Sequence, residues 1–228
     1  GVEIGGKKIE MKMVEEKKNI YFLGIGGIGM SALARYFKAK GYAVAGYDRV
    51  ASALTMELEA EQISVHYEDD VRLIPDSFKV VSDTRVVFTP AVPASMSEME
   101  WFKENGFDLL KRSQLLGEVT RMQQGLCVAG THGKTTTSTM LAHLLRNSTV
   151  DCNAFLGGIS KNFQKNLLLS EKSNLVVIEA DEYDRSFWTL SPQMAVITAV
   201  DADHLDIYGT EENYRASFET FTSLIRPG

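Results

Sequence analysis

The stretch Ala129-Gly130-Thr131-His132-Gly133-Lys134-Thr135-Thr136-Thr137 lies near the middle of the chain. An apolar run over 126–129 leads into it, and a helix-favouring run over 138–146 follows. A strand, a glycine turn, a Lys-Thr pair and a helix form the layout of a phosphate-binding loop. In such a loop, backbone N–H groups and the N-terminus of the helix face the anion. The stretch therefore predicts an α/β unit that binds nucleotide phosphates.

Two side chains of this loop can do the chemistry of a nucleoside triphosphate site. Lys134 can reach the terminal phosphates, and the Thr135 hydroxyl can bind Mg²⁺. The general pattern has a glycine five residues before Gly133, where this chain has Val128, so the loop is a shorter form. A glycine-rich turn with a surface lysine is the alternative, but it leaves the three threonines unexplained. We expect an ATP site formed by Gly130, Thr131, His132, Gly133, Lys134, Thr135 and Thr136.

Composition limits the class of protein. The chain has 228 residues, of which 44% are hydrophobic and 24% charged, as in ordinary globular proteins. Its formal charge of −6 disfavours a nucleic-acid partner. Cys127 and Cys152 form neither a metal-ligand spacing nor a disulfide framework, and no secretory signal is recognisable. No apolar run approaches the roughly 18 residues that span a membrane. We therefore predict a cytoplasmic protein with no membrane partner.

A second glycine turn lies near the start of the chain. An apolar strand over 19–24 runs into Gly24-x-Gly26-x-x-Gly29, followed by a predicted helix over 30–40 and a strand over 42–47 that ends at Asp48. This is a Rossmann-like βαβ pattern, in which the glycines let the backbone approach a diphosphate and the acid binds a ribose or base. A nicotinamide-dependent oxidoreductase is one interpretation, but it leaves the phosphate loop unexplained.

The remaining pattern predicts two α/β domains built on parallel sheets. Strands and helices alternate from Asp48 to Met122, and the strand over 85–89 ends in the rigid loop Thr89-Pro90-Ala91-Val92-Pro93. Ligands bind at such carboxyl ends of strands. Gln123-Gln124-Gly125 is interpreted as a linker. We expect a flexible tail over 1–18, a Rossmann-like domain over 19–123 and a truncated P-loop ATPase-type domain over 124–228.

Acidic residues follow two further apolar strands of the second domain. The strand over 174–178 runs into Glu179, the position at which nucleoside triphosphatases carry the acid that holds Mg²⁺. The strand over 193–200 runs into Asp201-Ala202-Asp203-His204, and a neutral imidazole can bind a divalent cation. The predicted metal ligands are Thr135, Glu179 and His204. The other acids after Glu179 fit a solvated loop equally well, and His66 and His143 are interpreted as structural.

These motifs, in this order and spacing, resemble the Mur ligase family, the ATP-dependent amino-acid ligases of peptidoglycan synthesis. The resemblance rests on the Gly-Thr-x-Gly-Lys-Thr-Thr loop over 130–136, on Glu179 and on Asp203-His204, and it extends over residues 19–226. It is greatest to the members that add L-alanine to UDP-N-acetylmuramate, because of the turn over 24–31, His132 and the acidic segment 179–184.

The resemblance implies a role for each motif. The first domain would hold the UDP-sugar, with Asp48 near the uridine and His132 of the second domain facing the muramoyl group. Lys134 would contact the β- and γ-phosphates of ATP, and Thr135 and Glu179 would hold one Mg²⁺ and His204 a second. Lys134, Glu179 and His204 are the implied catalytic residues. The other implied UDP-sugar contacts are Gly24, Gly26, Gly27, Ile28, Gly29, Thr89 and Ala91.

The implied reaction transfers the γ-phosphoryl group of ATP to the lactyl carboxylate, and the L-alanine amine then displaces phosphate. The resemblance implies a third, C-terminal domain that these 228 residues are expected to lack, so we expect them to bind UDP-N-acetylmuramate but to ligate little. Phe218 stands near the position at which some members carry a carbamylated lysine. Another Mur-type ligase and a non-catalytic P-loop nucleotide-binding module remain as alternatives. Dimerisation through the exposed edge of the last strand is a further hypothesis.

Overall fold

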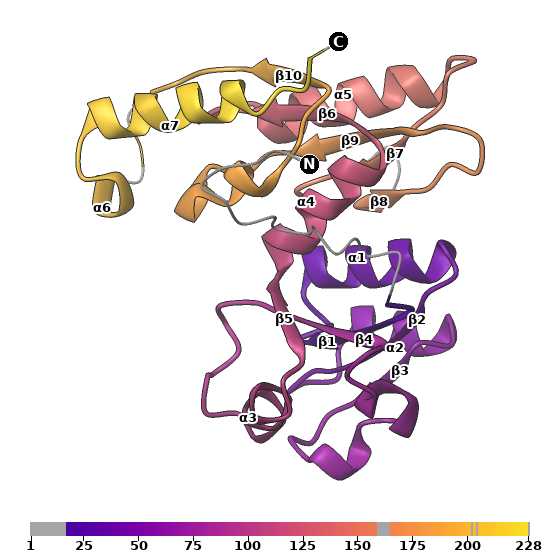
Figure 1. Cartoon of the computed structure of the whole chain (residues 1–228). Helices are drawn as coiled ribbons and strands as arrows, with labels where there is room; N and C mark the ends of the chain where they lie inside the picture. The colour runs from indigo at the N-terminus through magenta and orange to yellow at the C-terminus, as the bar shows by residue number, and fades with distance from the viewer. Residues whose placement is uncertain (1–16, 159–164, 202, 204, 228) are drawn as a thin grey trace.

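The computed structural model describes residues 17–158, 165–201, 203 and 205–227, and it contains two α/β units (Figure 1). The sheet of the first unit is entirely parallel, in the order β3-β2-β1-β4-β5. This confirms the predicted Rossmann-like architecture. Its elements are β1 (Asn19–Leu23), α1 (Ile28–Ala39), β2 (Ala43–Tyr47), α2 (Ala53–Ala60), β3 (Ser64–His66), the 3-10 helices η2 (Val71–Leu73) and η3 (Asp76–Lys79), β4 (Thr84–Phe88), α3 (Ser97–Glu104) and β5 (Asp108–Lys111).

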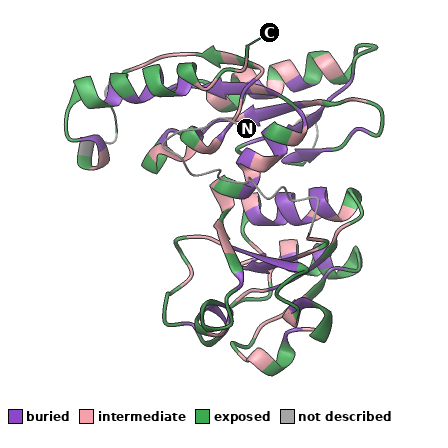
Figure 2. Ribbon diagram, in the orientation of Figure 1, coloured by how far each residue is buried: buried purple, intermediate pink, exposed green. Residues whose placement is uncertain are grey.

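Side chains of β1 alternate between two cores. Ile20 and Phe22 pack with α1, whereas Tyr21 and Leu23 pack with α3 on the opposite face. The parallel register aligns Leu23 with the last residues of β2 and β4, which are Tyr47 and Phe88. The segments that follow these three strands therefore emerge at the same edge of the sheet. Buried residues are concentrated in the strands and in α1 (Figure 2).

The second unit has the sheet order β10-β6-β9-β7-β8. All its pairs are parallel except β7–β8, which is antiparallel. β8 has only two residues, too few for any recognisable sequence period. The elements are β6 (Gln124–Ala129), α5 (Lys134–Arg146), β7 (Asn153–Phe155), β8 (Leu167–Leu168), β9 (Leu175–Glu179), the 3-10 segment η4 (Tyr183–Thr189), β10 (Met194–Ile197), α6 (Leu205–Tyr208) and α7 (Glu211–Ser223).

Helix α4 (Arg112–Met122) joins the two units and contacts both (Figure 1). It begins directly after β5, so Lys111 occupies the N-cap position. The sequence pattern suggested a linker over 123–125. Gln124 already belongs to β6, so only Gln123 separates the helix from the strand. The interpretation of a linker is therefore wrong, and the joint between the units is a packed helix.

Gly117 allows α4 to lie directly against η4. A Cβ atom on this residue would lie 2.2 Å from the carbonyl oxygen of Thr189. The neighbouring Thr120 accepts a hydrogen bond from the N–H of Ser191 at 2.8 Å. Because the obstructing atom belongs to the backbone, the helix and η4 cannot both keep their places when a methyl group is added.

We therefore predict that Gly117→Ala lowers the free energy of unfolding by about 2 kcal/mol or more, the usual cost of overpacking a tight contact. Equilibrium denaturation in urea measures this. Gly158→Ala is the matched control, because a Cβ on Gly158 has no atom within 4 Å. Equal stability of the two variants would show that the α4–η4 contact is not tight in solution.

A buried polar cluster lies inside the first unit, where α3 meets β1 and β3. The Tyr21 hydroxyl donates to Glu98 Oε2 at 2.8 Å and lies 2.6 Å from His66 Nε2. His66 Nδ1 donates to the carbonyl oxygen of Glu68 at 2.9 Å, so its Nε2 faces Glu98 Oε1 at 3.3 Å. Burial raises the pKa of Glu98 to about 7 and lowers the pKa of His66. His66 is thus structural within the described contacts, as the sequence interpretation expected.

This cluster predicts a pH-dependent stability. Because the pKa of Glu98 is raised, this residue stabilises the fold fully at a pH below the ordinary pKa of a carboxyl group. The stabilisation is lost as the pH rises through about 7. Because the pKa of His66 is lowered, the stabilisation from His66 is lost as the pH falls, which is the opposite dependence to that of Glu98. In Glu98→Gln the amide imitates the protonated acid, so this variant should gain stability relative to wild type as the pH rises from 5 to 8. Thermal unfolding across that range tests the prediction, with exposed Glu100→Gln as control. A difference in unfolding temperature between Glu98→Gln and wild type that does not change with pH would contradict the prediction.

β10 is an edge strand of the second sheet, and its Met194 and Val196 are 65% and 45% exposed. An edge strand with exposed apolar side chains is a site at which chains can associate. Dimerisation through this edge stays a prediction. Within the described residues, no helix is long and apolar enough to cross a bilayer.

Candidate functional site

The phosphate loop connects β6 to α5 at the carboxyl edge of the second sheet. Gly130 has φ of 132°, and a Cβ there would lie 2.2 Å from the hydroxyl oxygen of Thr198. Gly133 has φ of 81° and occupies the N-cap position of α5. Both positions therefore require glycine, because other residues rarely adopt such angles. The loop leaves the first N–H groups of α5 facing outward, where an anion can bind them.

Thr131 shapes the loop through hydrogen bonds within the protein. Its N–H donates to the carbonyl oxygen of Ala199 at 2.9 Å. Its hydroxyl donates to the carbonyl oxygen of Asp201 at 2.9 Å and lies 2.9 Å from the hydroxyl of Tyr214. Both donors are thus engaged within the protein, and the contact of Thr131 with ATP stays a prediction.

Lys134 is held by a buried acid that the sequence interpretation did not single out. Its Nζ lies 2.8 and 3.0 Å from the two carboxylate oxygens of Glu182 and donates to the carbonyl oxygen of Gly130 at 2.6 Å. The side chain of Glu182 is only 2% exposed, and the Tyr208 hydroxyl donates to its backbone carbonyl. The lysine is thus kept extended over the loop with its charge compensated.

The Thr135 hydroxyl donates to Glu179 Oε1 at 2.9 Å. The other carboxylate oxygen accepts from the N–H of Gly157 at 2.8 Å, and a Cβ on Gly157 would lie 2.4 Å from it. A hydroxyl and a carboxylate fit Mg²⁺, which takes one or two protein oxygens together with phosphates and water. The described residues contain no group of three acids, histidines or cysteines suited to a metal. His204 lies outside the described residues, so its role stays a prediction.

A hollow of about 370 Å³ lies over the phosphate loop. Exposed His132 faces this hollow, so it lies beside Thr135 and Glu179. The hollow thereby brings together the predicted residues of this loop, except Gly130, with the predicted metal acid. The lining residues are Thr131, His132, Gly133, Lys134, Thr135, Thr136 and Glu179.

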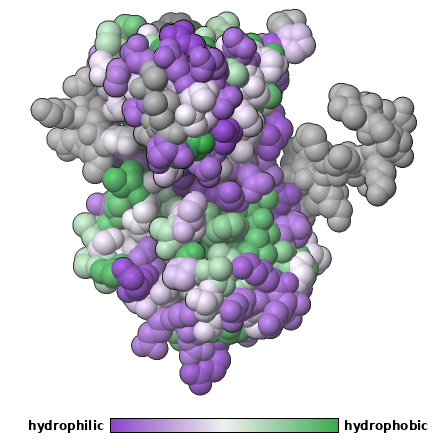
Figure 3. Space-filling view, turned by 90° about the vertical axis from the view of Figure 1, so that its left-hand side faces the viewer, coloured by the Kyte–Doolittle hydropathy of each residue, from purple (hydrophilic) through white to green (hydrophobic). Residues whose placement is uncertain are grey.

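The first glycine turn follows β1 and enters α1. Gly24 has φ of 85°, and the N–H of Gly26 donates to Asp48 Oδ2 at 2.7 Å. The other oxygen of Asp48 accepts from the N–H of Val50 at 3.2 Å, so this acid shapes the turn. Asp48 also lines a hollow of about 520 Å³ on the side of the β4–α3 loop, where Figure 3 shows apolar residues on the lower unit. Of the predicted residues, this hollow collects Gly24, Gly27, Asp48, Thr89 and Ala91.

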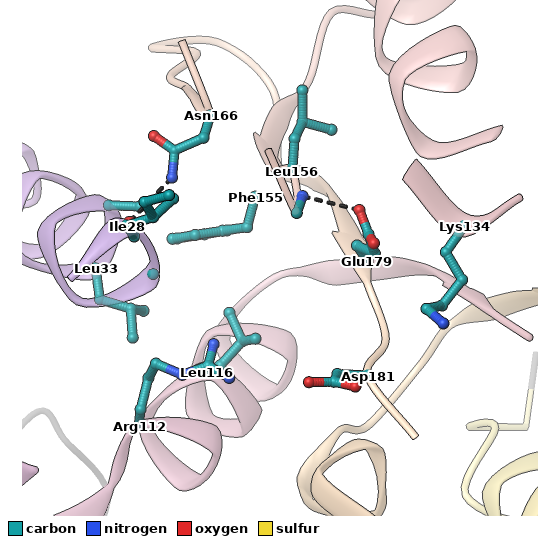
Figure 4. Close-up of a pocket in the computed structure, with 13 residues that line it drawn as sticks. Ile28, Leu33, Arg112, Leu116, Lys134, Phe155, Leu156, Asn166, Glu179 and Asp181 are labelled. Carbon is teal, nitrogen blue, oxygen red and sulfur yellow. Dashed lines mark hydrogen bonds between the residues drawn. The ribbon is translucent and has the colours of Figure 1, made fainter. Parts of the chain in front are cut away.

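A further cavity of about 350 Å³ lies between the two units and joins the two glycine turns (Figure 4). Ile28 and Gly29 of α1 line one side, and Lys134 and Glu179 line the other. The side-chain amide of Asn166 donates to the carbonyl oxygen of Ile28 at 3.0 Å and so ties the units together. The remaining polar lining residues are Asp181, which belongs to the acidic segment 179–184, and Arg112 and Asn166, which no motif marks.

Two family models match the chain. The model described as "Mur ligase family, catalytic domain" matches residues 19–124, and the model "Mur ligase middle domain" matches residues 128–228. The solved structure of a UDP-N-acetylmuramate:L-alanyl-gamma-D-glutamyl-meso-diaminopimelate ligase from Neisseria meningitides is 30% identical with a TM-score of 0.80, covering 93% of this chain and 69% of that one. The chain belongs to the Mur ligase family. The expected family resemblance is confirmed.

Other relatives of this Mur ligase chain share the same two units. This chain is 63% identical over 211 residues to the UDP-N-acetylmuramate–L-alanine ligase of Porphyromonas gingivalis, and 64% identical over 208 residues to that of Parabacteroides distasonis. These alignments cover 92% and 91% of this chain but 46% and 45% of the relatives. The chain thus spans about half the length of the curated relatives it matches. A solved UDP-N-acetylmuramate-alanine ligase of Thermotoga maritima matches at 31% identity and a TM-score of 0.76, over 91% of this chain and 47% of that one.

Proposed function

We propose that this chain is the part of an ATP-dependent ligase that binds UDP-N-acetylmuramate and the phosphates of ATP, and that the whole enzyme joins L-alanine to the lactyl carboxylate. The observation that carries the proposal is the shared cavity, because Gly29 of the first turn and Lys134 of the phosphate loop line the same space. A ligand whose diphosphate lies on the first turn can extend through this cavity toward the phosphate loop. The high identity to named L-alanine ligases supports the choice of substrate.

Lys134 supplies charge for phosphoryl transfer. Its ammonium group lies 2.8 Å from a carboxylate oxygen of Glu182. When ATP binds, the lysine turns from Glu182 to the β- and γ-phosphates, where its charge offsets repulsion between ATP and the lactyl carboxylate. Thr135 and Glu179 would hold Mg²⁺, which supplies further positive charge at the phosphates.

The reaction balances in two steps. A lactyl carboxylate oxygen attacks the γ-phosphorus, the bond to the β-phosphate oxygen breaks, and ADP leaves. The L-alanine amine then attacks the acyl carbon, inorganic phosphate leaves, and the nitrogen loses a proton as the amide forms.

A panel of ligands in a thermal-unfolding experiment tests the proposal on this chain. Ligands that bind the folded state raise the unfolding temperature according to their concentration relative to Kd. We expect stabilisation by UDP-N-acetylmuramate and by Mg-ATP, and none by NADH. Stabilisation by NADH alone would favour an oxidoreductase. Stabilisation by nucleoside triphosphate without any effect of the UDP-sugar would favour a nucleotide-binding module.

A second candidate is a ligase that adds a peptide in place of L-alanine. It is favoured by the match to the Neisseria ligase, with a TM-score of 0.80. Measuring the release of ADP distinguishes the two candidate activities. A natural full-length protein that carries this sequence is given either L-alanine or L-alanyl-γ-D-glutamyl-meso-diaminopimelate, and the substrate that causes ADP release identifies the activity. We propose that the 228-residue chain alone binds the UDP-sugar but shows little L-alanine-dependent ADP release.

A further inference from the structure

Arg112 is the first residue of α4, at the joint between the two units. It is half-buried, and it lines both the cavity between the units and a smaller hollow of about 250 Å³ beside η4. Figure 4 shows its side chain reaching from α4 into the cavity. It also lies against the turn that begins α1, since a Cβ on Gly29 would be 3.0 Å from its Nη1.

The charge of Arg112 has no partner within the part of the chain that the structure describes. Two other buried or half-buried arginines have carboxylate partners: Arg35 pairs with Glu57 and Glu61, and Arg85 pairs with Glu118. Half-buried Arg185 lies over the rings of Trp188 and Tyr208, and half-buried Arg226 donates to the carbonyl oxygen of Gln123. Withdrawing a guanidinium from water without an anion costs free energy. A fork of N–H donors kept in this state is preorganised for an anion that comes from outside the chain.

The position of Arg112 indicates which anion it meets. Its guanidinium lies against the first turn of α1, beside the glycine turn on which the diphosphate is proposed to lie. The opposite wall of the cavity carries Lys134, which is proposed to serve the ATP phosphates, together with Glu179 and Asp181. An anion close to Gly29 is therefore a phosphate of the ligand on the first unit and not a phosphate of ATP.

We propose that Arg112 binds the sugar-side phosphate of the nucleoside diphosphate sugar through two parallel N–H···O bonds. The inference rests on the proposed function, because it needs a diphosphate at the Gly24–Gly29 turn. α4 then links the ligand of the first unit to the second unit, because the same helix packs against η4 and β6. Arg112 acts as a binding residue, and glycine at position 29 leaves room for its side chain.

Calorimetric titration of wild type, Arg112→Gln and Arg112→Lys with UDP, UMP and UDP-N-acetylmuramate tests the proposal. Loss of a bidentate charged contact should raise the Kd of Arg112→Gln for UDP and for UDP-N-acetylmuramate by about 10- to 100-fold. UMP, which lacks the second phosphate, should change less than about threefold. Arg112→Lys should recover part of the loss. Exposed Arg215→Gln on α7 is the control for a change of net charge.

Three outcomes would overturn the proposal. Equal losses for UDP and UMP, accompanied by a lower unfolding temperature of Arg112→Gln, would give the residue a structural role. A loss confined to UDP-N-acetylmuramate, with UDP unchanged, would assign the guanidinium to the lactyl carboxylate. Unchanged binding of all three ligands would leave the residue without a role in binding. Failure of wild type to bind any of the three would instead refute the proposed function itself.

Discussion

Lys134→Ala is expected to weaken the binding of Mg-ATP by about 30-fold or more, because the variant loses charge-assisted hydrogen bonds to the phosphates. It should also destabilise the protein by about 3 kcal/mol, the usual cost of leaving one partner of a buried pair alone. The partner is Glu182, whose side chain is 2% exposed and 2.8 Å from the lysine. Titration with Mg-ATP and denaturation in urea measure the two effects separately.

The double variant Lys134→Ala/Glu182→Gln separates these two effects. Neutralising Glu182 removes the uncompensated buried charge, so most of the lost stability should return. Binding of Mg-ATP should remain weak, because the ammonium group is still missing. If the double variant regained nucleotide binding, or if Lys134→Ala bound Mg-ATP like wild type, the assignment of Lys134 to the phosphates would be wrong.

Glu179→Gln is the second substitution with a large expected effect. The carboxylate accepts hydrogen bonds from the Thr135 hydroxyl at 2.9 Å and from the N–H of Gly157 at 2.8 Å. Glutamine keeps an acceptor but removes the negative charge, so the affinity for Mg²⁺ should fall while the loop remains folded. We expect the stimulation of ATP binding by Mg²⁺ to decrease by about 10-fold or more.

The stimulation by Mg²⁺ is measured by titrating wild type and Glu179→Gln with ATP, once in EDTA and once in excess MgCl₂. Exposed Glu212→Gln, in the first turn of α7, is the control for the loss of one acid. Binding of UDP-N-acetylmuramate should change little, because the proposed diphosphate site lies on the first unit. An unaltered response to Mg²⁺ in Glu179→Gln would remove this residue from the metal site.

The parts of the fold that could be predicted are those determined by local sequence. Gly24 and Gly133 mark turns because the backbone there has a positive φ that favours glycine, and the apolar runs before them are long enough to identify strands. The α/β class and both glycine turns follow from these signals. β8 could not be predicted, because two residues carry no period and the strand depends on pairing with β7.

The site was predictable only where a motif marked it. Lys134, Thr135 and Glu179 lie close together because each follows the end of a strand or begins the helix after it. Glu182 and Arg112 carry no such signal. Glu182 is one of several acids in its segment, and only burial beside Lys134 distinguishes it. Arg112 is singled out by its contact with α1, a neighbour more than 80 residues away along the chain.

The central claim is that a UDP-sugar on the first turn and ATP phosphates on the loop approach each other in one cavity. Paramagnetic relaxation of UDP-N-acetylmuramate protons by Mn²⁺, added with ATP in place of Mg²⁺, tests it most directly. The strongest relaxation should fall on the lactyl methyl protons and the weakest on the uracil H6 proton, since Glu179 and Gly29 line opposite sides of the cavity. Equal relaxation of both groups, or stronger relaxation of the uracil, would contradict the account.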